Sequence, residues 1–350
     1  MRIGMLAPLW ERVPPEKYGG TELVVYNLTE ELVRRGHEVT LFASGDSITS
    51  AKLRSIRLRA LRPHPDQLNP GCYSMLHAAE CFRHADRFDL IHNHAGWNAI
   101  PMAALVSTPT VTTLHDRVNG EGAMVFRHYE EHPCISISNS YRECAPWLNY
   151  VATVHNGIMV ERFPFRDRPD ADPYLAFLGR FSPEKATHLA IAAARRAGWR
   201  LKIGAKLPDN PRDEQYYKEV IMPQIDGDQI QYLGELNHDQ KVELLSGAHA
   251  LMFPIQWDEP FGLVMIEALA CGTPVIACCR GSVQEVIEPG VAGLVCEEVE
   301  ELPGAIARIG EVDRAGCRAY VEQHFSVGAM TDAYLVAYDQ VLAPPLVQVA

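Results

Sequence analysis

Short apolar runs alternate with segments of helical periodicity along the chain. After the run Ile3–Leu6, Leu28 and Leu32 recur at helical spacing, with Thr21 as the candidate N-cap and Gly36 as the stop. Further strand-like runs lie at Glu38–Phe42, Phe88–His92, Thr110–Leu114, Cys134–Ser138 and Val151–Val154, with helical stretches near 73–86, 97–106 and 140–149. This alternation predicts βαβ units and therefore a mostly parallel, doubly wound sheet.

A break in composition separates this half from a second one. Asn156-Gly157 is a turn pair, and residues 163–173 are rich in proline and charge, as in a linker. Strand-like runs resume at Tyr174–Leu178, Arg200–Gly204, Gln229–Leu233, Ala250–Phe253 and Pro274–Ala277, with helices expected near 185–197, 213–223, 238–246, 262–271, 299–310 and 328–341. We predict an α/β protein with two Rossmann-like domains, 1–155 and 156–327, facing a central cleft. A C-terminal helix in 328–350 could pack back on the first domain.

The composition excludes several classes of protein. The chain has 350 residues, 47% hydrophobic and 22% charged, which is ordinary for a globular protein. The net charge is −12, and residues 161–350 hold most of the acidic excess, which argues against nucleic acid as a partner. The N-terminus does not resemble a signal peptide, and the nine cysteines lack zinc-pair spacing. We therefore expect reduced thiols, no metal site and a cytoplasmic protein.

One local run of positive charge departs from this acidic background. It comprises Lys52, Arg54, Arg57, Arg59 and Arg62, with no acidic residue among them. Such a run is typical of a solvated strand or loop. The alternative is a surface for an anionic acceptor or for peripheral contact with the inner membrane face.

The most informative stretch runs from Asp258 to Ile276. The strand at Ala250–Phe253 leads into a turn, and a helix is expected from near Gly262 to Gly272. A helix that begins at the carboxyl end of a parallel strand directs free N–H groups and its positive dipole end toward a ligand. Glu259 precedes this helix, and Glu267 lies within it. Eight helical residues span about 12 Å, too far for a glycosidase pair, so two separate acceptors for sugar or ribose hydroxyls are the better interpretation.

A second cluster follows the strand at Tyr174–Leu178. Arg180 and Lys185 flank a turn, and Ser182-Pro183-Glu184 opens the next helix. Two cations at the carboxyl end of a strand suit a diphosphate group.

With these motifs, the chain resembles glycosyltransferase family 4, retaining nucleotide-sugar enzymes of GT-B fold. The resemblance rests on Arg180 and Lys185, on the two glutamates with Pro260-Phe261-Gly262 between them, and on Asn156-Gly157-Ile158. Tyr18-Gly19-Gly20-Thr21-Glu22 and Thr113-Leu114-His115-Asp116 fit the same family. The chain departs from the family pattern at Met159, where the family usually has Asp, and at Ala186, where Gly often follows the lysine.

The resemblance implies a role for each matching residue. Arg180 and Lys185 would hold the donor diphosphate, Glu267 the ribose and Glu259 the donor sugar. His115 would contact the transferred sugar near the reacting centre. Further donor contacts are implied for Gly20, Gly234, Leu236, Phe261, Gly262, Leu263 and Val264. Gly19, Gly20, His92, His94 and Asp116 are weaker candidates for the acceptor side.

The pair His92 and His94 also stands out by its spacing. Two residues apart on a strand, these side chains point to the same face and could in principle bind a metal. No carboxylate or cysteine pattern completes a ligand set, so the histidines either line the acceptor side or are structural.

The expected activity is transfer of a hexose from a UDP- or GDP-linked sugar to the hydroxyl of a glycan, lipid-linked or small-molecule acceptor, with retention. Because protein cations meet the diphosphate, we expect no metal and no cofactor. Catalytic roles are expected for His115, Glu259, Arg180 and Lys185. The alternatives are a nucleotide-sugar epimerase or hydrolase of the same fold and a non-catalytic nucleotide-sugar binder. The absence of Gly-x-Gly-x-x-Gly after the first strand of either half disfavours a dinucleotide-dependent oxidoreductase.

Overall fold

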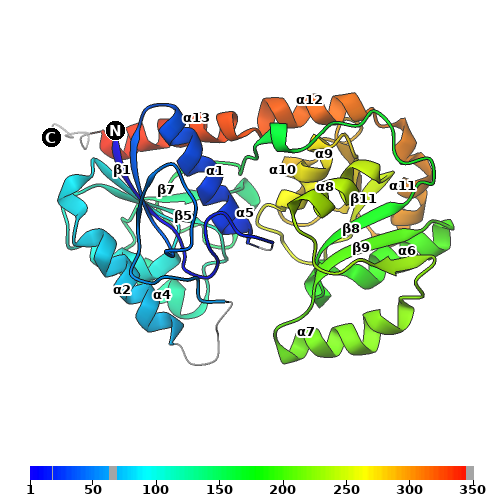
Figure 1. Ribbon diagram of the computed structural model, residues 1–350, viewed down its shortest axis with the longest axis horizontal. Helices are drawn as coiled ribbons and strands as arrows, with labels where there is room; N and C mark the ends of the chain where they lie inside the picture. The colour runs from blue at the N-terminus through cyan, green and yellow to red at the C-terminus, as the bar shows by residue number, and fades with distance from the viewer. Residues whose placement is uncertain (18, 63–68, 344–350) are drawn as a thin grey trace. The chain divides into compact units, whose positions relative to one another are not determined.

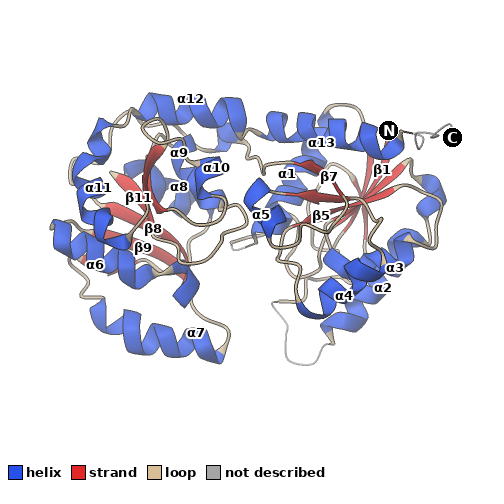
Figure 2. Ribbon diagram, turned by 180° about the vertical axis from the view of Figure 1, so that it is seen from behind, coloured by secondary structure: helices blue, strands red, loops and turns tan. Residues whose placement is uncertain are grey.

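The computed structural model describes residues 1–17, 19–62 and 69–343 (Figure 1). Contacts divide the chain into two compact units. The first contains Met1–Pro15, Gly19–Gly157 and the C-terminal residues from Val327; the second is built on Ile158–Ser326. Each unit has its own parallel sheet (Figure 2).

The first unit contains a seven-stranded sheet in the order β3-β2-β1-β4-β5-β6-β7. Every neighbouring pair is parallel. The strands are β1 Arg2–Leu6, β2 Glu38–Phe42, β3 Lys52–Arg54, β4 Leu90–Asn93, β5 Thr110–Leu114, β6 Cys134–Ser136 and β7 Tyr150–Thr153. β1, β4 and β5 are central and almost wholly buried, as the apolar runs predict for a parallel sheet.

Helices cover this sheet. They are α1 Gly20–Arg34, α2 Pro70–Phe82, α3 Ile100–Ala103, α4 Gly120–His128, α5 Asn139–Glu143 and the C-terminal α13 Val327–Leu342. Ala78, Cys81 and Phe82 of α2 pack with Leu6 and Phe42 of the strands. Helix α13 packs on α1, β5 and β7, so the last helix of the chain belongs to the core of the first unit (Figure 1, red).

The second unit contains a six-stranded parallel sheet in the order β10-β9-β8-β11-β12-β13. Its strands are β8 Leu175–Arg180, β9 Leu201–Lys206, β10 Ile230–Tyr232, β11 Ala250–Phe253, β12 Val275–Cys278 and β13 Gly293–Cys296. Its α-helices are α6 Thr187–Ala197, α7 Pro211–Tyr216, α8 His238–Gly247, α9 Leu263–Ala270, α10 Val283–Val286, α11 Leu302–Arg308 and α12 Arg314–His324. Helix α9 packs on β11 and β12, with α12 against it.

The predicted fold class is confirmed, and most expected elements are present. Some predictions were wrong in detail. Thr21 lies inside α1, and the N-cap is Gly19, because the chain enters this helix at a backbone angle (φ 151°) that favours glycine. The short edge strands β3 and β13 and the helices α4 and α12 were not predicted, since their apolar positions are few or interrupted.

None of the helices within the described ranges is long and apolar enough to cross a membrane.

Candidate functional site

The loop after β8 contains the two predicted diphosphate residues. Arg180 is the last residue of β8, and Lys185 ends the 3-10 turn Pro183–Lys185. Both side chains are partly buried, and Nε of Arg180 is a buried donor without a partner in the described part of the chain. A buried donor without a partner costs about 1–3 kcal/mol, so this guanidinium is suited to receive an anionic ligand.

The loop after the neighbouring strand β11 brings Glu259 to Lys185. The Nζ of Lys185 lies 2.6 Å from Oε2 of Glu259, and the Trp257 indole N–H donates to the same oxygen at 2.8 Å. Glu259 is only 8% exposed, so the pair is largely removed from solvent. The structure thus brings together a residue predicted at the diphosphate and one predicted at the donor sugar. Sequence reasoning missed Trp257, whose only signal was its position beside Asp258-Glu259.

Helix α9 begins directly after this loop, as predicted. Gly262 is its N-cap with φ 81°, and a Cβ there would lie 2.8 Å from Met265 Cε. Leu263 and Val264 form the first turn, where backbone N–H groups have no intrahelical acceptor. Phe261 is buried against Phe325 at a ring-centroid distance of 5.9 Å. The start of α9 therefore offers positive potential and free donors to an anion.

Glu267 lies one turn further along α9 and is 4% exposed. Its carboxylate forms an ion pair with Nζ of Lys241 on α8. Lys241 carried no signal in the sequence, because it lies 26 residues away on another helix. The pair keeps Glu267 oriented while one carboxylate oxygen accepts from the lysine.

The loop after β12 is hydrogen-bonded to the backbone of the loop after β11, which carries Glu259. Ser282 N–H donates to the Glu259 carbonyl at 3.0 Å, and Ser282 Oγ donates to the Phe261 carbonyl at 2.9 Å. Gly281 has φ 58°, and a Cβ on it would lie 2.3 Å from the Glu259 nitrogen. These two residues, also missed from the sequence, fix the backbone that carries Glu259 and Phe261.

Gly234 and Leu236, the weaker donor candidates, follow β10. Gly234 has φ 85° and accepts a hydrogen bond from Ala205 N–H at 2.9 Å. Leu236 is partly buried and packs against Gly204 of β9. Both follow the carboxyl end of β10 and lie beside the last residues of β9, on the same edge of the sheet as Arg180.

In the first unit, Gly19 and Gly20 form the start of α1. Gly19 is buried, and a Cβ there would lie 2.8 Å from Pro15 Cβ, whereas Gly20 is exposed. Two glycines allow the loop after β1 to approach the helix closely. Tyr18 of the same motif lies outside the described residues.

The histidines of the first unit form one hydrogen-bonded chain. His94 follows β4 and His115 follows the neighbouring β5, and His94 Nδ1 lies 2.8 Å from His115 Nε2. His94 Nε2 is 3.2 Å from His92 Nδ1, which also meets Tyr338 Oη of α13 at 2.7 Å. Burial lowers the pKa of His115 to about 4 and the pKa values of His92 and His94 well below their usual range, so all three rings are neutral near pH 7.

Asp116, the next residue, is exposed, and its carbonyl accepts a hydrogen bond from Tyr141 Oη. His115 itself is only partly exposed. At this edge of the first sheet, the ring of His115 is therefore held by neighbours while part of it faces outward.

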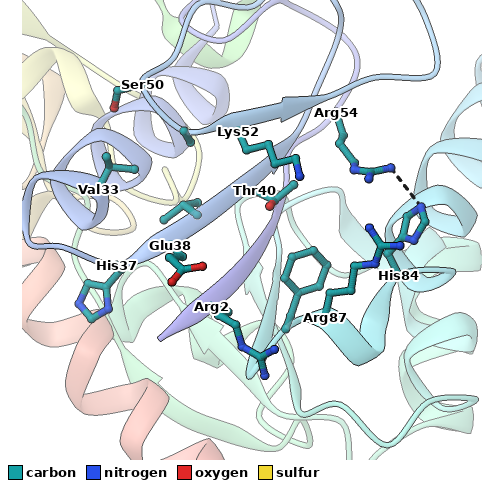
Figure 3. A pocket seen from close by; sticks show the side chains of 13 residues that line it. Arg2, Val33, His37, Glu38, Thr40, Ser50, Lys52, Arg54, His84 and Arg87 are labelled. Carbon is teal, nitrogen blue, oxygen red and sulfur yellow. Dashed lines mark hydrogen bonds between the residues drawn. The ribbon is translucent and has the colours of Figure 1, made fainter.

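The basic run does not form one surface. Lys52 and Arg54 of β3 line a cavity of 410 Å³ together with Arg2 and Arg87 (Figure 3). The other three diverge: Arg57 stacks on Tyr73 at 4.9 Å, Arg62 pairs with Glu11 at 3.2 Å, and Arg59 is exposed.

Comparison with known proteins finds a matching glycosyltransferase family model for each of the two units. The family model for Glycosyltransferase Family 4 matches residues 18–143, and the model for Glycosyl transferases group 1 matches residues 161–315. The chain is 27% identical to a glycogen synthase of Mycobacterium tuberculosis, over 88% of this chain and 86% of that protein.

Two solved structures share the fold. A sucrose-phosphate synthase from Thermosynechococcus elongatus matches with a TM-score of 0.78 at 22% identity, covering 97% of this chain and 98% of that one. HepE of Anabaena, in complex with UDP and glucose, matches with a TM-score of 0.71 at 19% identity, covering 96% and 99%. The chain belongs to glycosyltransferase family 4 and has the GT-B fold.

Proposed function

We propose that this glycosyltransferase moves a hexose from a UDP- or GDP-linked sugar to an acceptor hydroxyl, with retention at the anomeric carbon and without a metal ion. The observation that carries the proposal is that Arg180 and Lys185 follow β8 while α9 follows the neighbouring strand β11, on the same edge of the second sheet. The complex of the structurally similar HepE with UDP and glucose supports a nucleotide-sugar donor.

In this proposal the protein acts mainly by electrostatic stabilisation. The bond between the anomeric carbon and the diphosphate breaks, negative charge develops on the leaving group, and fixed cations and N–H groups are already placed to meet that charge. The bond to the acceptor oxygen forms on the same face, and the acceptor proton passes to the leaving phosphate. Glu259 would hold sugar hydroxyls, Glu267 the ribose, and His115 the transferred sugar.

The Lys185–Glu259 pair gives this scheme a specific feature. Lys185 forms an ion pair with Glu259, the carboxylate that would face the sugar. The same ammonium group would therefore contact both Glu259 and the donor diphosphate.

The test is product analysis with a UDP- or GDP-linked glucose or mannose and a panel of acceptors, followed by proton NMR of the anomeric coupling. We expect a product with the donor's anomeric configuration. Inversion would contradict the same-face scheme. Release of free sugar at an unchanged rate without any acceptor would favour an epimerase or hydrolase.

A second measurement tests metal independence. The described site has cations, not a carboxylate cluster, where the diphosphate would bind, so turnover at fixed donor should be unchanged by EDTA. Loss of turnover on chelation, restored by Mg²⁺ or Mn²⁺, would show that the cations are not sufficient.

Peripheral contact with an anionic membrane stays a prediction. Its support is Leu58, which is 86% exposed between Arg57 and Arg59, an apolar side chain flanked by cations. Sedimentation with vesicles containing anionic phosphatidylglycerol should carry the protein down, whereas neutral phosphatidylcholine vesicles should not. Leu58→Glu should abolish this binding; equal binding by this variant would contradict the contact.

A further inference from the structure

Two side chains donate hydrogen bonds to one and the same oxygen of Glu259. The Nζ of Lys185 lies 2.6 Å from Oε2, and the Nε1 of Trp257 lies 2.8 Å from that oxygen. The direction of both bonds is fixed, because an ammonium group and an indole N–H can only donate. Each carboxylate oxygen has two acceptor sites, so both sites of Oε2 are occupied.

The second oxygen of this carboxylate, Oε1, is in a different state. Among the described residues it has neither a hydrogen-bond donor nor a cation as a partner. The Glu259 side chain is 10% exposed, so the carboxylate is not sealed inside the protein. Oε1 therefore keeps its acceptor sites for a ligand.

The two donors come from loops that are themselves joined. Gln256 N–H donates to the Glu184 carbonyl at 3.0 Å. These residues directly precede Trp257 and Lys185, so the bond joins the two loops beside both donors. The Nζ of Lys185 also lies 5.6 Å from the centre of the Trp257 ring. Both donors therefore reach Glu259 from one connected piece of backbone.

Lys185 alone would not define the orientation of the carboxylate. The terminal torsion of a glutamate side chain is broad, and an ammonium group on a flexible stem can follow either oxygen. The indole of Trp257 is a rigid ring with a single N–H in a set direction. Its bond selects one oxygen for the position beside Lys185 and thereby places the other.

We propose that Trp257 is a positioning residue that holds one oxygen of Glu259 beside Lys185, so that Oε1 presents an acceptor to a hydroxyl of the donor sugar. The role of Oε1 rests on the proposed glycosyl transfer, whereas the hydrogen bond from Trp257 does not depend on it. Because the free oxygen of a carboxylate only accepts, the group that it takes must be a donor, as a sugar hydroxyl is.

Trp257→Phe tests this role, because it keeps an aromatic ring and removes the N–H. We expect kcat/KM for the sugar donor to fall about tenfold, since the carboxylate can then turn away from the hydroxyl. UDP and GDP lack the transferred sugar, so their affinities in calorimetric titration should stay as in the wild type. A structural role in holding the whole loop would weaken nucleotide binding as well, and that result would contradict the proposal.

Trp199→Phe is the matched control. Trp199 lies in the same unit and is likewise partly buried, but its ring stacks on His249 at a centroid distance of 4.5 Å. Its indole N–H forms no hydrogen bond within the described residues. The substitution removes the same atoms away from Glu259, so kcat/KM should stay as in the wild type.

A double variant separates an effect through Glu259 from a direct contact between the indole and the sugar. When Glu259→Ala has already removed the carboxylate, adding Trp257→Phe should lower kcat/KM no further. A second loss of about tenfold in this background would overturn the inference. A Trp257→Phe enzyme as active as Trp199→Phe would overturn it too.

NMR of the indole N–H groups tests the hydrogen bond without turnover. In protein labelled with ¹⁵N-tryptophan, the Trp257 signal is identified by its loss in Trp257→Phe, or by phenylalanine variants of the other four tryptophans if that variant does not fold. Glu259→Ala should move this proton signal upfield, because a charged acceptor is lost, and should leave the Trp199 signal in place. An unmoved Trp257 signal would overturn the inference. A moved signal in a protein whose wild type transfers no sugar would instead overturn the proposed function.

Discussion

Ala186 shows how strongly the site constrains single residues. It follows Lys185 and has a left-handed backbone (φ 53°, ψ 43°) while being fully buried. This conformation costs about 1–2 kcal/mol for a residue with a Cβ and explains why glycine is common at this place in the family. The strain lies between the Lys185 turn and α6, so it bears directly on where the lysine is held.

We predict that Ala186→Gly keeps or raises the melting temperature, whereas Ala186→Val lowers the free energy of unfolding by about 2 kcal/mol. Glycine adopts positive φ without strain, and a β-branched residue does so least readily. Urea unfolding of both variants measures the difference. Equal stability of the two variants would contradict the assigned backbone conformation.

The two glutamates should differ in which ligand they affect. Glu267→Ala should weaken both the nucleoside diphosphate and the intact donor, by roughly 1.5–3 kcal/mol, because the ribose is common to both. Glu259→Ala should lower turnover and donor affinity while nearly sparing the nucleoside diphosphate. Calorimetric titration of both variants with the nucleoside diphosphate and with the donor, together with steady-state rates, tests this difference.

Each glutamate variant also leaves a lysine without its carboxylate, so Glu267→Gln and Glu259→Gln serve as companions that keep the size of the side chain. The opposite pattern, with Glu259→Ala abolishing nucleotide binding and Glu267→Ala sparing it, would reverse the placement of the donor along α9.

At the scale of elements, the loop after β12 acts as a support for the loop after β11. A Cβ at Gly281 would lie 2.3 Å from the Glu259 nitrogen, so Gly281→Ala must displace the backbone that carries Glu259. We expect kcat/KM to fall about tenfold or more, in line with the sensitivity of a site to displacements near 1 Å.

Gly290→Ala is the matched control, because Gly290 also has positive φ (82°) but a Cβ added there would have no neighbouring atom within 4 Å. It carries the same kind of backbone strain without the collision. If the two variants lose activity equally, the close packing at Gly281 does not matter to the site.

Several elements could be predicted from local sequence patterns, whereas contacts between distant helices could not. Buried strands such as β11 and β12 are continuous apolar runs, and Gly262 and Gly272 bracket α9, so local signals predicted these elements. The candidate donor residues on this helix were instead implied by the family resemblance. Lys241 and Tyr338 could not, because their partners are set by which helices pack together, which no local pattern records.

At the scale of the whole molecule, stability should depend on pH through buried histidines. Burial lowers the pKa of five histidines in the folded state, to about 4 for three of them: His77, His115 and His132, with His92 and His94 also lowered. Each therefore contributes stability that is present above the unfolded pKa of about 6.5 and is lost as pH falls toward 4, by up to about 1.4 kcal/mol per pH unit.

The buried carboxyl of Glu22 has the opposite effect on the pH dependence of stability. Burial raises its pKa to about 7, so its contribution is present at acid pH and is lost as pH rises through 7. The five histidines outweigh the one carboxyl, so the free energy of unfolding should rise from pH 5 to pH 7. Urea titrations across this range test the balance; a flat or falling profile would contradict the buried, neutral state of the histidines.

The edge of the second sheet with Arg180, Lys185 and the start of α9 should bind a nucleoside diphosphate. The most direct test is calorimetric titration of UDP, GDP and ADP into the wild type, Arg180→Ala and Arg59→Ala. One nucleotide should bind the wild type and Arg59→Ala equally, and at least about tenfold more weakly to Arg180→Ala, since a charge-assisted hydrogen bond contributes about 1.5–3 kcal/mol. Binding of none of the three, or equal binding to all three proteins, would contradict the account.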